Sequence, residues 1–310
     1  MEIGVYIPQV GFTWDELRAR VQVCDAAGIH SVWFMDHLYP PALPGVPSFE
    51  AWTTAAALAP LTQRLRFGHL VLCNAFRHPA LLAKMAITLD HASGGRLTIG
   101  LGSGSYAPEF DAFGLPFASA RERGERLGES LAVLTQLFAA ERSTFDGRYY
   151  ALRDAPSLPR PVQQPRPPLH VGGAGERYTL PLAARYADAW NCPTYALASF
   201  ERKLAALHAA CLRIGRDPAT LAVTQEAVLV LVERGEDLDA ARALAERRFA
   251  GPGWGLAAGG YCGTPEAIVA RLRACAARGV RSVIFFLHDR AEPATLQLLA
   301  REVLPQVADL

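Results

Sequence analysis

The stretch "SVWFMDHLYP", residues 31–40, indicates how this chain folds. It begins as an apolar run, which is typical of a buried strand, and then changes abruptly to the acid and the imidazole of Asp36 and His37. A single pair of this kind could arise by chance. If other apolar strands also end in polar residues, those ends would converge on one rim of a sheet.

Short apolar segments alternate with helical patterns along the whole chain. We expect eight strands, at residues 3–9, 31–36, 65–72, 96–104, 169–173, 188–192, 221–232 and 282–287. Parallel strands need helical crossovers, and eight such units can close into a barrel. The sequence therefore predicts an α/β fold, a TIM (β/α)8 barrel with insertions, in which residues 1–310 form a single domain.

The helices between the strands have recognisable ends. Thr13 and Glu16 form a capping-box pattern at the start of a helix that ends at Gly28, a residue tolerant of left-handed backbone. Further helices are expected at about 48–61, 79–92, 119–140 and from 293 onward. The Pro-rich stretch 145–168 cannot form a helix or a central strand, so we predict an excursion from the barrel there.

The composition argues against several classes of protein. The net charge is +1 and the basic residues are scattered, so nothing suggests a nucleic-acid footprint. No apolar run reaches the ~18–20 residues needed to span a bilayer, and the N-terminus begins as a strand without a signal peptide. We therefore expect a cytosolic protein that binds neither nucleic acid nor membrane. Six cysteines without a CxxC pair favour core thiols over a disulfide framework or a zinc cluster.

In a barrel of this kind, the chemistry lies at the C-terminal ends of the strands. The residues at those ends are Pro8, Gln9, Asp36, His37, Leu72, Cys73, Asn74, Gly102, Ser103, Gly104, Ser105, Gly172, Gly173, Asn191, Cys192, His288 and Asp289. The seventh strand contributes few polar groups. Asp36 is either part of a site or an acceptor that caps a helix or anchors a loop, and His37 is either catalytic or a surface residue.

Glycines follow the fourth and the fifth predicted strand, where they would let a flat or charged ligand approach the backbone. The segment "GGAGER", residues 172–177, also opens a helix, so its free amides and the helix dipole would form a phosphate site. Arg177 could add a charged fork to it. The alternative is that these glycines only make tight turns, but two glycine-rich ends beside Asp36 and His37 favour a ligand.

Two other kinds of barrel chemistry lack their residues. Metal-dependent barrel hydrolases usually carry an HxH motif on the first strand, which here ends in Pro8 and Gln9, so we predict no metal site. A Schiff-base aldolase needs a lysine inside the barrel mouth. Lys84 and Lys203 are the only lysines, and both lie in predicted helices.

Four blocks of the chain resemble the luciferase-like monooxygenase superfamily, and more closely its branch that uses the deazaflavin coenzyme F-420. They are "VWFMDHLYP" (32–40), "GHLVLCNAFRHPALLAKMAITLDHASGGRLTIGLGSG" (68–104), "FDGRYYAL" (145–152) and "HVGGAGERYTLPLAARYADAWN" (170–191). The resemblance covers residues 1 to about 290. It implies a homodimeric oxidoreductase with the deazaflavin across the strand ends and hydride transfer between ring carbon C5 and a small organic substrate.

The resemblance also implies roles for individual residues. His37 would transfer a proton at the redox-active edge of the ring, and Leu70 and Val71 match the site of a non-prolyl cis peptide behind the ring. Tyr106 is expected to cover the substrate side. The residues predicted to bind the cofactor are Asp36, His37, Leu70, Val71, Asn74, Gly102, Ser103, Gly104, Gly172, Gly173, Glu176 and Arg177.

Ser105 and the run Tyr39-Pro40-Pro41 depart from the sugar-phosphate dehydrogenase branch, which has a glutamate and a tryptophan at those places. A sugar phosphate is therefore doubtful as the substrate. The Pro, Gly, Tyr and Trp residues of loops 38–48, 145–166 and 250–263 favour an apolar or aromatic molecule. Two alternatives stay open: an FMN-dependent monooxygenase that uses oxygen and a reductase partner, and a non-catalytic flavin-binding protein.

Overall fold

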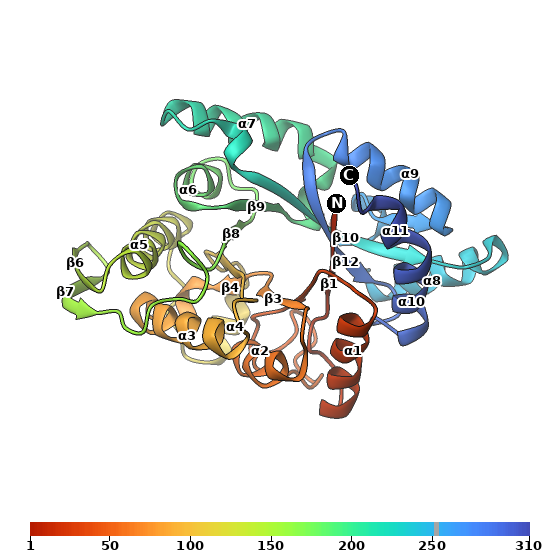
Figure 1. Cartoon of the computed structure of the whole chain (residues 1–310), viewed down its shortest axis with the longest axis horizontal. Helices are drawn as coiled ribbons and strands as arrows, with labels where there is room; N and C mark the ends of the chain where they lie inside the picture. Colours follow the sequence, from red (N-terminus) through yellow and green to blue (C-terminus); the bar gives the residue numbers. More distant parts are fainter. Residues whose placement is uncertain (251–253) are drawn as a thin grey trace.

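The computed structural model describes residues 1–250 and 254–310, which form a parallel barrel with helices around its outside (Figure 1). Its neighbouring strands follow the order β3-β2-β1-β12-β10-β9-β8-β5-β4. The strands are β1 (Glu2–Tyr6), β2 (Ser31–Phe34), β3 (Arg66–His69), β4 (Leu72–Cys73), β5 (Ile99–Gly102), β8 (Leu169–Gly172), β9 (Ala189–Cys192), β10 (Ala222–Leu231) and β12 (Val280–Leu287).

The third strand of the barrel is interrupted. β3 pairs with β2, and after a break of two residues β4 pairs with β5 on the other side. A bridge between Phe67 and Leu97 joins β3 to the segment before β5 and helps to close the ring. Because β3 and β4 share one position, the described residues form eight strand positions, and the predicted barrel is confirmed.

The helices cover the outer face of the sheet, and most of the core lies between the two layers. They are α1 (Trp14–Ala26), α2 (Ala51–Leu58), α3 (Pro79–Ala92), α5 (Ala120–Ala139), α6 (Thr179–Tyr186), α7 (Phe200–Arg213), α8 (Leu238–Arg248), α9 (Pro265–Ala276), α10 (Pro293–Leu298) and α11 (Leu304–Val307). In the described part of the chain, no helix combines the length and the hydropathy that a membrane crossing requires. All six cysteines are free.

The ends of the first two helices are set by side-chain caps. The predicted capping box of α1 is confirmed: Glu16 N donates to Thr13 Oγ1 at 3.3 Å, and Thr13 N donates to Glu16 Oε2 at 2.8 Å. The start predicted for the second helix was three residues too early. Its cap is Glu50, whose carboxylate accepts from the amides of Trp52 and Thr53 at 3.0 and 2.6 Å.

Two segments add strands that the sequence analysis did not predict. The Pro-rich excursion lies outside the barrel, as predicted, but its first part forms an antiparallel ribbon of β6 (Arg142–Asp146) and β7 (Ala151–Pro156) (Figure 1). β11 (Tyr261–Gly263) extends the sheet by pairing with the end of β10. Residues 251–253 of the predicted substrate loop 250–263 lie outside the described residues.

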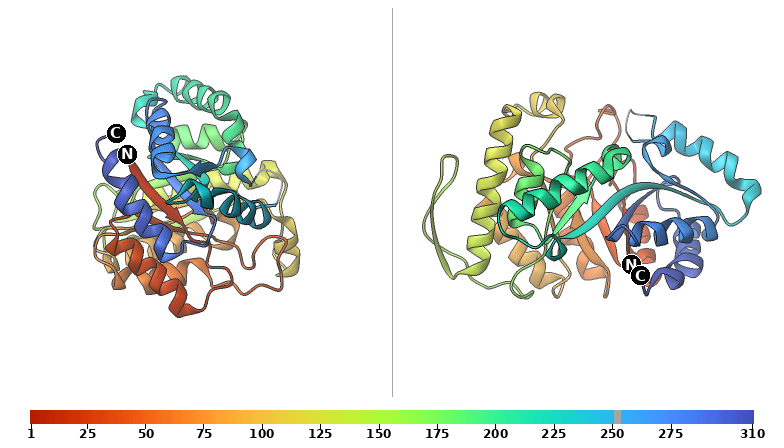
Figure 2. Two further views of the ribbon diagram at one scale, coloured as in Figure 1. Left: turned by 90° about the vertical axis from the view of Figure 1, so that its right-hand side faces the viewer. Right: turned by 90° about the horizontal axis from the view of Figure 1, so that it is seen from above.

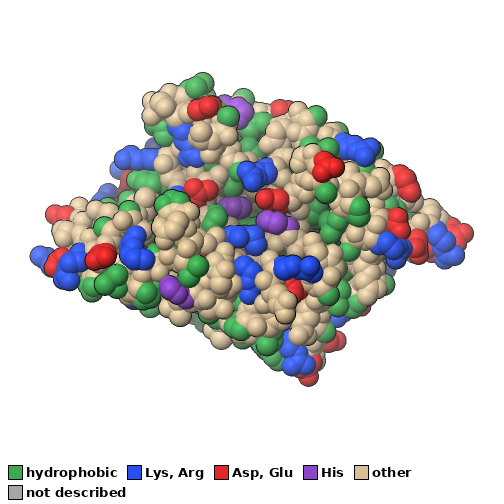
Figure 3. Space-filling view, viewed as in Figure 1, with side chains coloured by type: hydrophobic (Ala, Val, Ile, Leu, Met, Phe, Trp, Pro, Cys, Tyr) green, Lys and Arg blue, Asp and Glu red, His purple; other side chains and the backbone are tan. Residues whose placement is uncertain are grey.

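The two ends of the barrel differ. The termini lie at one end, and the loop after β2 and the short α4 (Ala107–Ala112) lie at the other (Figure 2, right). At the end with the termini, charged and histidine side chains gather around the centre of the surface (Figure 3). The barrel interior holds the buried cluster Tyr6, Trp33, Met35 and Ile284, so it is a packed core and not a channel.

Candidate functional site

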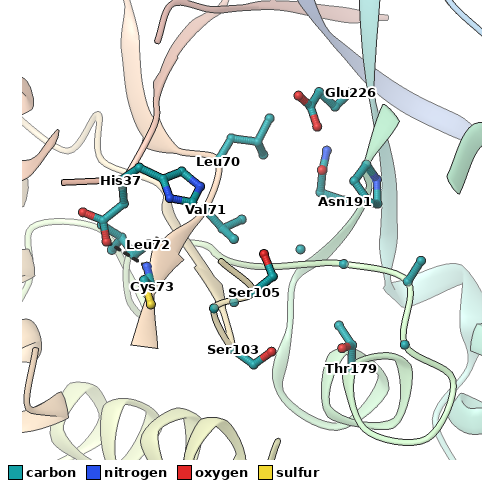
Figure 4. Close-up of a pocket in the computed structure, with 18 of the residues that line it drawn as sticks. His37, Leu70, Val71, Leu72, Cys73, Ser103, Ser105, Thr179, Asn191 and Glu226 are labelled. Atoms are coloured by element: carbon teal, nitrogen blue, oxygen red, sulfur yellow. Dashed lines mark hydrogen bonds between the residues drawn. The ribbon is translucent and has the colours of Figure 1, made fainter. Parts of the chain in front are cut away.

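The C-terminal ends of the strands surround a cleft of about 970 Å³ (Figure 4). Strand ends from β2, β4, β5, β8 and β9 contribute to it, so the predicted polar rim exists. The cleft brings together nine of the twelve residues predicted to bind the cofactor: Asp36, His37, Leu70, Val71, Gly102, Ser103, Gly104, Gly172 and Gly173.

Asp36 is buried at the edge of the cleft and anchors the strand beside it. Its Oδ2 accepts from the amide of Cys73 at 2.7 Å and from Arg77 Nη1 at 2.8 Å, while Oδ1 accepts from Arg77 Nη2 at 2.9 Å. Arg77 also donates to Glu50 at 2.5 Å. Asp36 therefore acts as a loop-anchoring acceptor that fixes the end of β4, one of the two interpretations open from the sequence.

His37 extends into the cleft from the end of β2 and is paired with a buried carboxylate. Its Nδ1 lies 2.9 Å from Oε2 of Glu109, whose side chain is only 1% exposed. The other oxygen of Glu109 accepts from the amide of Leu38. Because the carboxylate occupies Nδ1, Nε2 is the ring nitrogen left to exchange a proton with a molecule in the cleft (Figure 4).

Glu109 was missed by the sequence analysis. Ser105 stands at the place of the sugar-phosphate dehydrogenases' glutamate, and Glu109 follows four residues later. In the structure, α4 follows the glycines after β5 and places Glu109 against His37. The signal available in the sequence was weak: Glu109 is one of two acids, with Asp111, in a short segment soon after the fourth strand.

Val71 forms part of the cleft wall between two glycines. The Leu70–Val71 peptide bond is cis, as the resemblance implied. A Cβ added to Gly102 would lie 2.5 Å from Val71 Cγ2, and a Cβ on Gly172 would lie 2.5 Å from Val71 Cγ1. These two glycines therefore make room for Val71, and the close approach of a ligand to their backbone stays a prediction. The result is an apolar surface against which a planar ring can lie.

The turn after β8 supplies neutral hydrogen-bond donors. Residues 172–177 were predicted to open a helix, and this was wrong, because α6 begins only at Thr179. The hydroxyls of Thr179, Ser103 and Ser105 line the cleft (Figure 4), and none of the three is hydrogen-bonded within the described residues. No Lys or Arg in the described part of the chain lines the cleft. An anionic group would therefore be held by hydroxyls, backbone amides and the helix dipole.

Three of the predicted cofactor-binding residues do not line the cleft. Asn74 is buried behind its wall and lines a separate hollow. Glu176 forms ion pairs on the surface, with Lys203 Nζ at 2.8 Å from its Oε1. The guanidinium of Arg177 lies over the ring of Tyr178, 5.3 Å from its centroid, so it forms no fork at the cleft.

Two further rim residues support neighbouring loops. Gln9 is fully buried and its Nε2 donates to the carbonyls of Met35 and Phe49, at 2.5 and 2.9 Å. Tyr106, predicted to cover the substrate side, packs edge-on against His37, with ring centroids 6.2 Å apart. Its hydroxyl accepts from the amide of Ala42 at 3.0 Å, which fixes the loop after β2.

The lining gives no support to metal or thiolate chemistry. In the part of the chain that the structure describes, no group of three or more His, Cys, Asp and Glu side chains could hold a metal ion. Cys73 lines the cleft, but burial raises the pKa of its thiol to about 12. The thiol is therefore protonated at neutral pH and is a poor nucleophile.

Glu226 also faces the cleft and was also missed. The seventh strand was predicted to contribute few polar groups, and this was wrong. β10 pairs with β9 as far as Gln225 and Cys192 and then continues beyond the rim, so Glu226 reaches the rim from the middle of its strand. Its carboxylate lies across the cleft from His37 (Figure 4). Glu226 is 4% exposed, and burial raises its pKa to about 7.

We expect the free energy of unfolding of the Glu226→Gln variant, relative to that of the wild type, to be higher at pH 8 than at pH 5. The carboxyl titrates near 4.5 when unfolded and near 7 when folded, so its favourable contribution is complete below pH 4.5 and is lost as the pH rises through 7. Glutamine removes this dependence. From pH 5 to pH 8, the free energy of unfolding of the variant minus that of the wild type should increase by about 2–3 kcal/mol. Urea unfolding at both pH values measures it, and a difference that does not change with pH would contradict the assignment.

Fold and cleft together define an α/β-barrel protein with a ligand site at its C-terminal rim. A family model described as luciferase-like monooxygenase matches residues 1–256, and the chain belongs to this family. The family expected from the sequence is therefore confirmed.

Relatives and solved structures agree with this assignment. An F420-dependent hydroxymycolic acid dehydrogenase of Mycobacterium tuberculosis is 34% identical over 80% of this chain and 67% of its own length. An F420-dependent glucose-6-phosphate dehydrogenase of Beutenbergia cavernae is 32% identical over 99% of this chain and 97% of its own. The solved structure of an F420-dependent secondary alcohol dehydrogenase matches 99% of this chain and 98% of its own chain, with a TM-score of 0.81. Because the two sequences are only 18% identical, this match supports the fold alone.

Proposed function

We propose that this protein is an oxidoreductase that binds coenzyme F420 in the cleft and transfers a hydride to or from a small organic substrate. The observation that carries the proposal is the paired His37 and Glu109 beside the apolar wall of Val71. The two relatives above, both F420-dependent dehydrogenases, support it because one of them matches almost the full length of both chains.

The cleft has the features that F420 requires. The side chain of Val71 offers an apolar surface to the deazaflavin ring, and the hydroxyls of Ser103 and Thr179 with the turn after β8 offer neutral donors to its phosphate. When bound, F420 supplies the hydride acceptor or donor at C5. His37 Nε2 would take up or release the proton that accompanies oxidation or reduction of the substrate, and Glu109 would hold the ring in that orientation.

The substrate we propose is an uncharged one. The described lining of the cleft holds the carboxyl groups of Asp36, Glu109 and Glu226 but no Lys or Arg. The neutral donors around Thr179 are assigned to the phosphate of F420, so the phosphate of a sugar bound beside the coenzyme would have no Lys or Arg to pair with, which agrees with the departures at Ser105 and Tyr39. Cytosolic location and a homodimer stay predictions.

Titration of the purified protein with F420 and separately with FMN, followed by the fluorescence of each cofactor, tests the proposal. We expect saturable binding of F420 and weaker binding of FMN. Glu233→Ala serves as the control, because Glu233 pairs with Arg301 and does not line the cleft, so its loss should leave F420 binding unchanged. Preferential binding of FMN would replace the proposal with a flavin-dependent monooxygenase. F420 binding without turnover of any alcohol or carbonyl compound in a broad panel would indicate a flavin-binding protein.

A further inference from the structure

A second cavity lies against the cleft, on the side of the loop that follows β2. It shares His37 and Trp254 with the cleft. The rest of its wall is mainly carbon, from Tyr6, Val10 and Phe286 among others. We call this second cavity the apolar chamber.

Aromatic rings form one wall of the apolar chamber. The centroids of Tyr6 and Phe286 lie 5.1 Å apart, and those of Phe249 and Phe286 lie 4.6 Å apart, both in edge-to-face arrangements. Such pairs hold the three side chains in place, and their ring carbons form part of the wall of the apolar chamber. Leu43, on the loop after β2, lines the same chamber and is 54% exposed. The chamber is thus a preformed apolar hollow that opens near this loop.

The two arginines of the apolar chamber are already committed to the protein. Arg248 donates to the carbonyls of Leu287 and His288, at 3.0 and 3.1 Å, and lies over the ring of Phe286. Arg290 donates to the carbonyl of Val10 at 2.9 Å and also to that of Gly11. Since their hydrogen bonds close the wall behind the cavity, they are poorly placed to bind an anionic substrate.

His37 lies where the two cavities meet. Its Nδ1 is held by Glu109, so Nε2 is the group available at the junction. A molecule in the apolar chamber can therefore present one polar group to His37 while the rest of it stays among apolar side chains. This is the arrangement expected for a site with a large apolar lining and a few orienting polar groups.

We propose that the apolar chamber binds the hydrocarbon body of an uncharged secondary alcohol or ketone, with the oxygen-bearing carbon directed to His37. This inference rests on the proposed function and names its substrate class: long alkyl or aryl compounds rather than sugars or phosphate esters. The length of the hydrocarbon part determines affinity, because each methylene that enters the chamber leaves water.

Isothermal titration calorimetry with a series of 2-alkanones, from 2-hexanone to 2-decanone, tests this on the protein with and without F420. We expect binding to tighten by up to about fourfold per added methylene. The heat capacity change should become more negative along the series, since apolar surface is being buried. Glucose 6-phosphate, used as the hydrophilic comparison, should not compete with 2-decanone.

Val10→Trp fills the apolar chamber and should weaken 2-decanone binding at least tenfold, with a smaller effect on 2-hexanone. Val162→Trp is the matched control: Val162 is 46% exposed and lines neither cavity, so binding should be unchanged. If Val10→Trp does not fold, Leu43→Glu places a charge at the exposed edge and should weaken 2-decanone binding.

The outcomes separate the two proposals. Failure to bind F420 overturns the proposed function, whereas the alkanone titrations of the cofactor-free protein still report on the chamber. F420 binding together with an affinity that does not depend on chain length, or with a folded Val10→Trp variant that binds 2-decanone like the wild type, overturns the assignment of the chamber.

Discussion

Replacement of His37 by alanine is expected to lower kcat of the F420-dependent reaction by about 10²- to 10⁴-fold, the range that a positioned general acid or base contributes. In the proposed reaction Nε2 of His37 exchanges the proton. His37 lines both cavities, and Oε2 of Glu109 lies 2.9 Å from its other ring nitrogen, Nδ1. Steady-state kinetics with a substrate that the wild type turns over measures the loss. The affinity for F420 should stay close to that of the wild type, because Val71 and the donors around Thr179 are retained.

His208→Ala is the control for this experiment. His208 lies on α7 and lines neither the cleft nor the apolar chamber, so its loss should leave kcat unchanged. A His37→Ala variant that keeps the wild-type kcat would remove His37 from the mechanism. A variant that no longer binds F420 would show that His37 holds the coenzyme and is not only a proton carrier.

Replacement of Asp36 by alanine is expected to lower the free energy of unfolding by about 3–5 kcal/mol, the range for removing one partner of a buried ion pair. The side chains of Asp36 and Arg77 are 3% and 12% exposed. Their two hydrogen bonds and the bond from the amide of Cys73 would all be lost, leaving buried donors without acceptors. Equilibrium unfolding in urea, with wild type and variant side by side, gives the difference directly.

Glu233→Ala provides the comparison for a surface ion pair. Glu233 and Arg301 lie 2.7 Å apart, but their side chains are 68% and 56% exposed. Loss of the Glu233 side chain should lower the free energy of unfolding by less than about 1 kcal/mol, because exposed ion pairs are screened by solvent. Equal losses for Asp36→Ala and Glu233→Ala would mean that Asp36 does not anchor β4 in the way the hydrogen bonds indicate.

Much of the barrel could be predicted because its signals are local. Apolar runs separated by helical patterns located all eight strand positions, and Pro79 and the Thr13–Glu16 box located two helix starts. The start of α2 was missed because the glutamate cap, Glu50, is a weak signal next to Ser48, two residues earlier. The ribbon β6–β7 was missed because its strands are largely exposed and carry few apolar residues.

The candidate site divides in the same way. Asp36 and His37 could be found because they end an apolar strand, and the strand end fixes their place on the rim. Glu109 and Glu226 could not, since neither lies at a strand end. Glu109 depends on how α4 packs against β2, and Glu226 depends on the register that carries β10 beyond its neighbour.

By itself, the sequence determined the order of strands and helices, the family, and the side of the barrel on which the chemistry lies. The order of the elements and the side of the barrel follow from the spacing of apolar residues, which each segment expresses on its own, whereas the family follows from the resemblance of four sequence blocks. Only the tertiary structure decided which carboxylate holds His37, why Gly102 and Gly172 have no side chain, and that His37 stands between two cavities. Each of these depends on atoms from segments far apart in the chain meeting within a few ångströms, and no local pattern encodes such a distance.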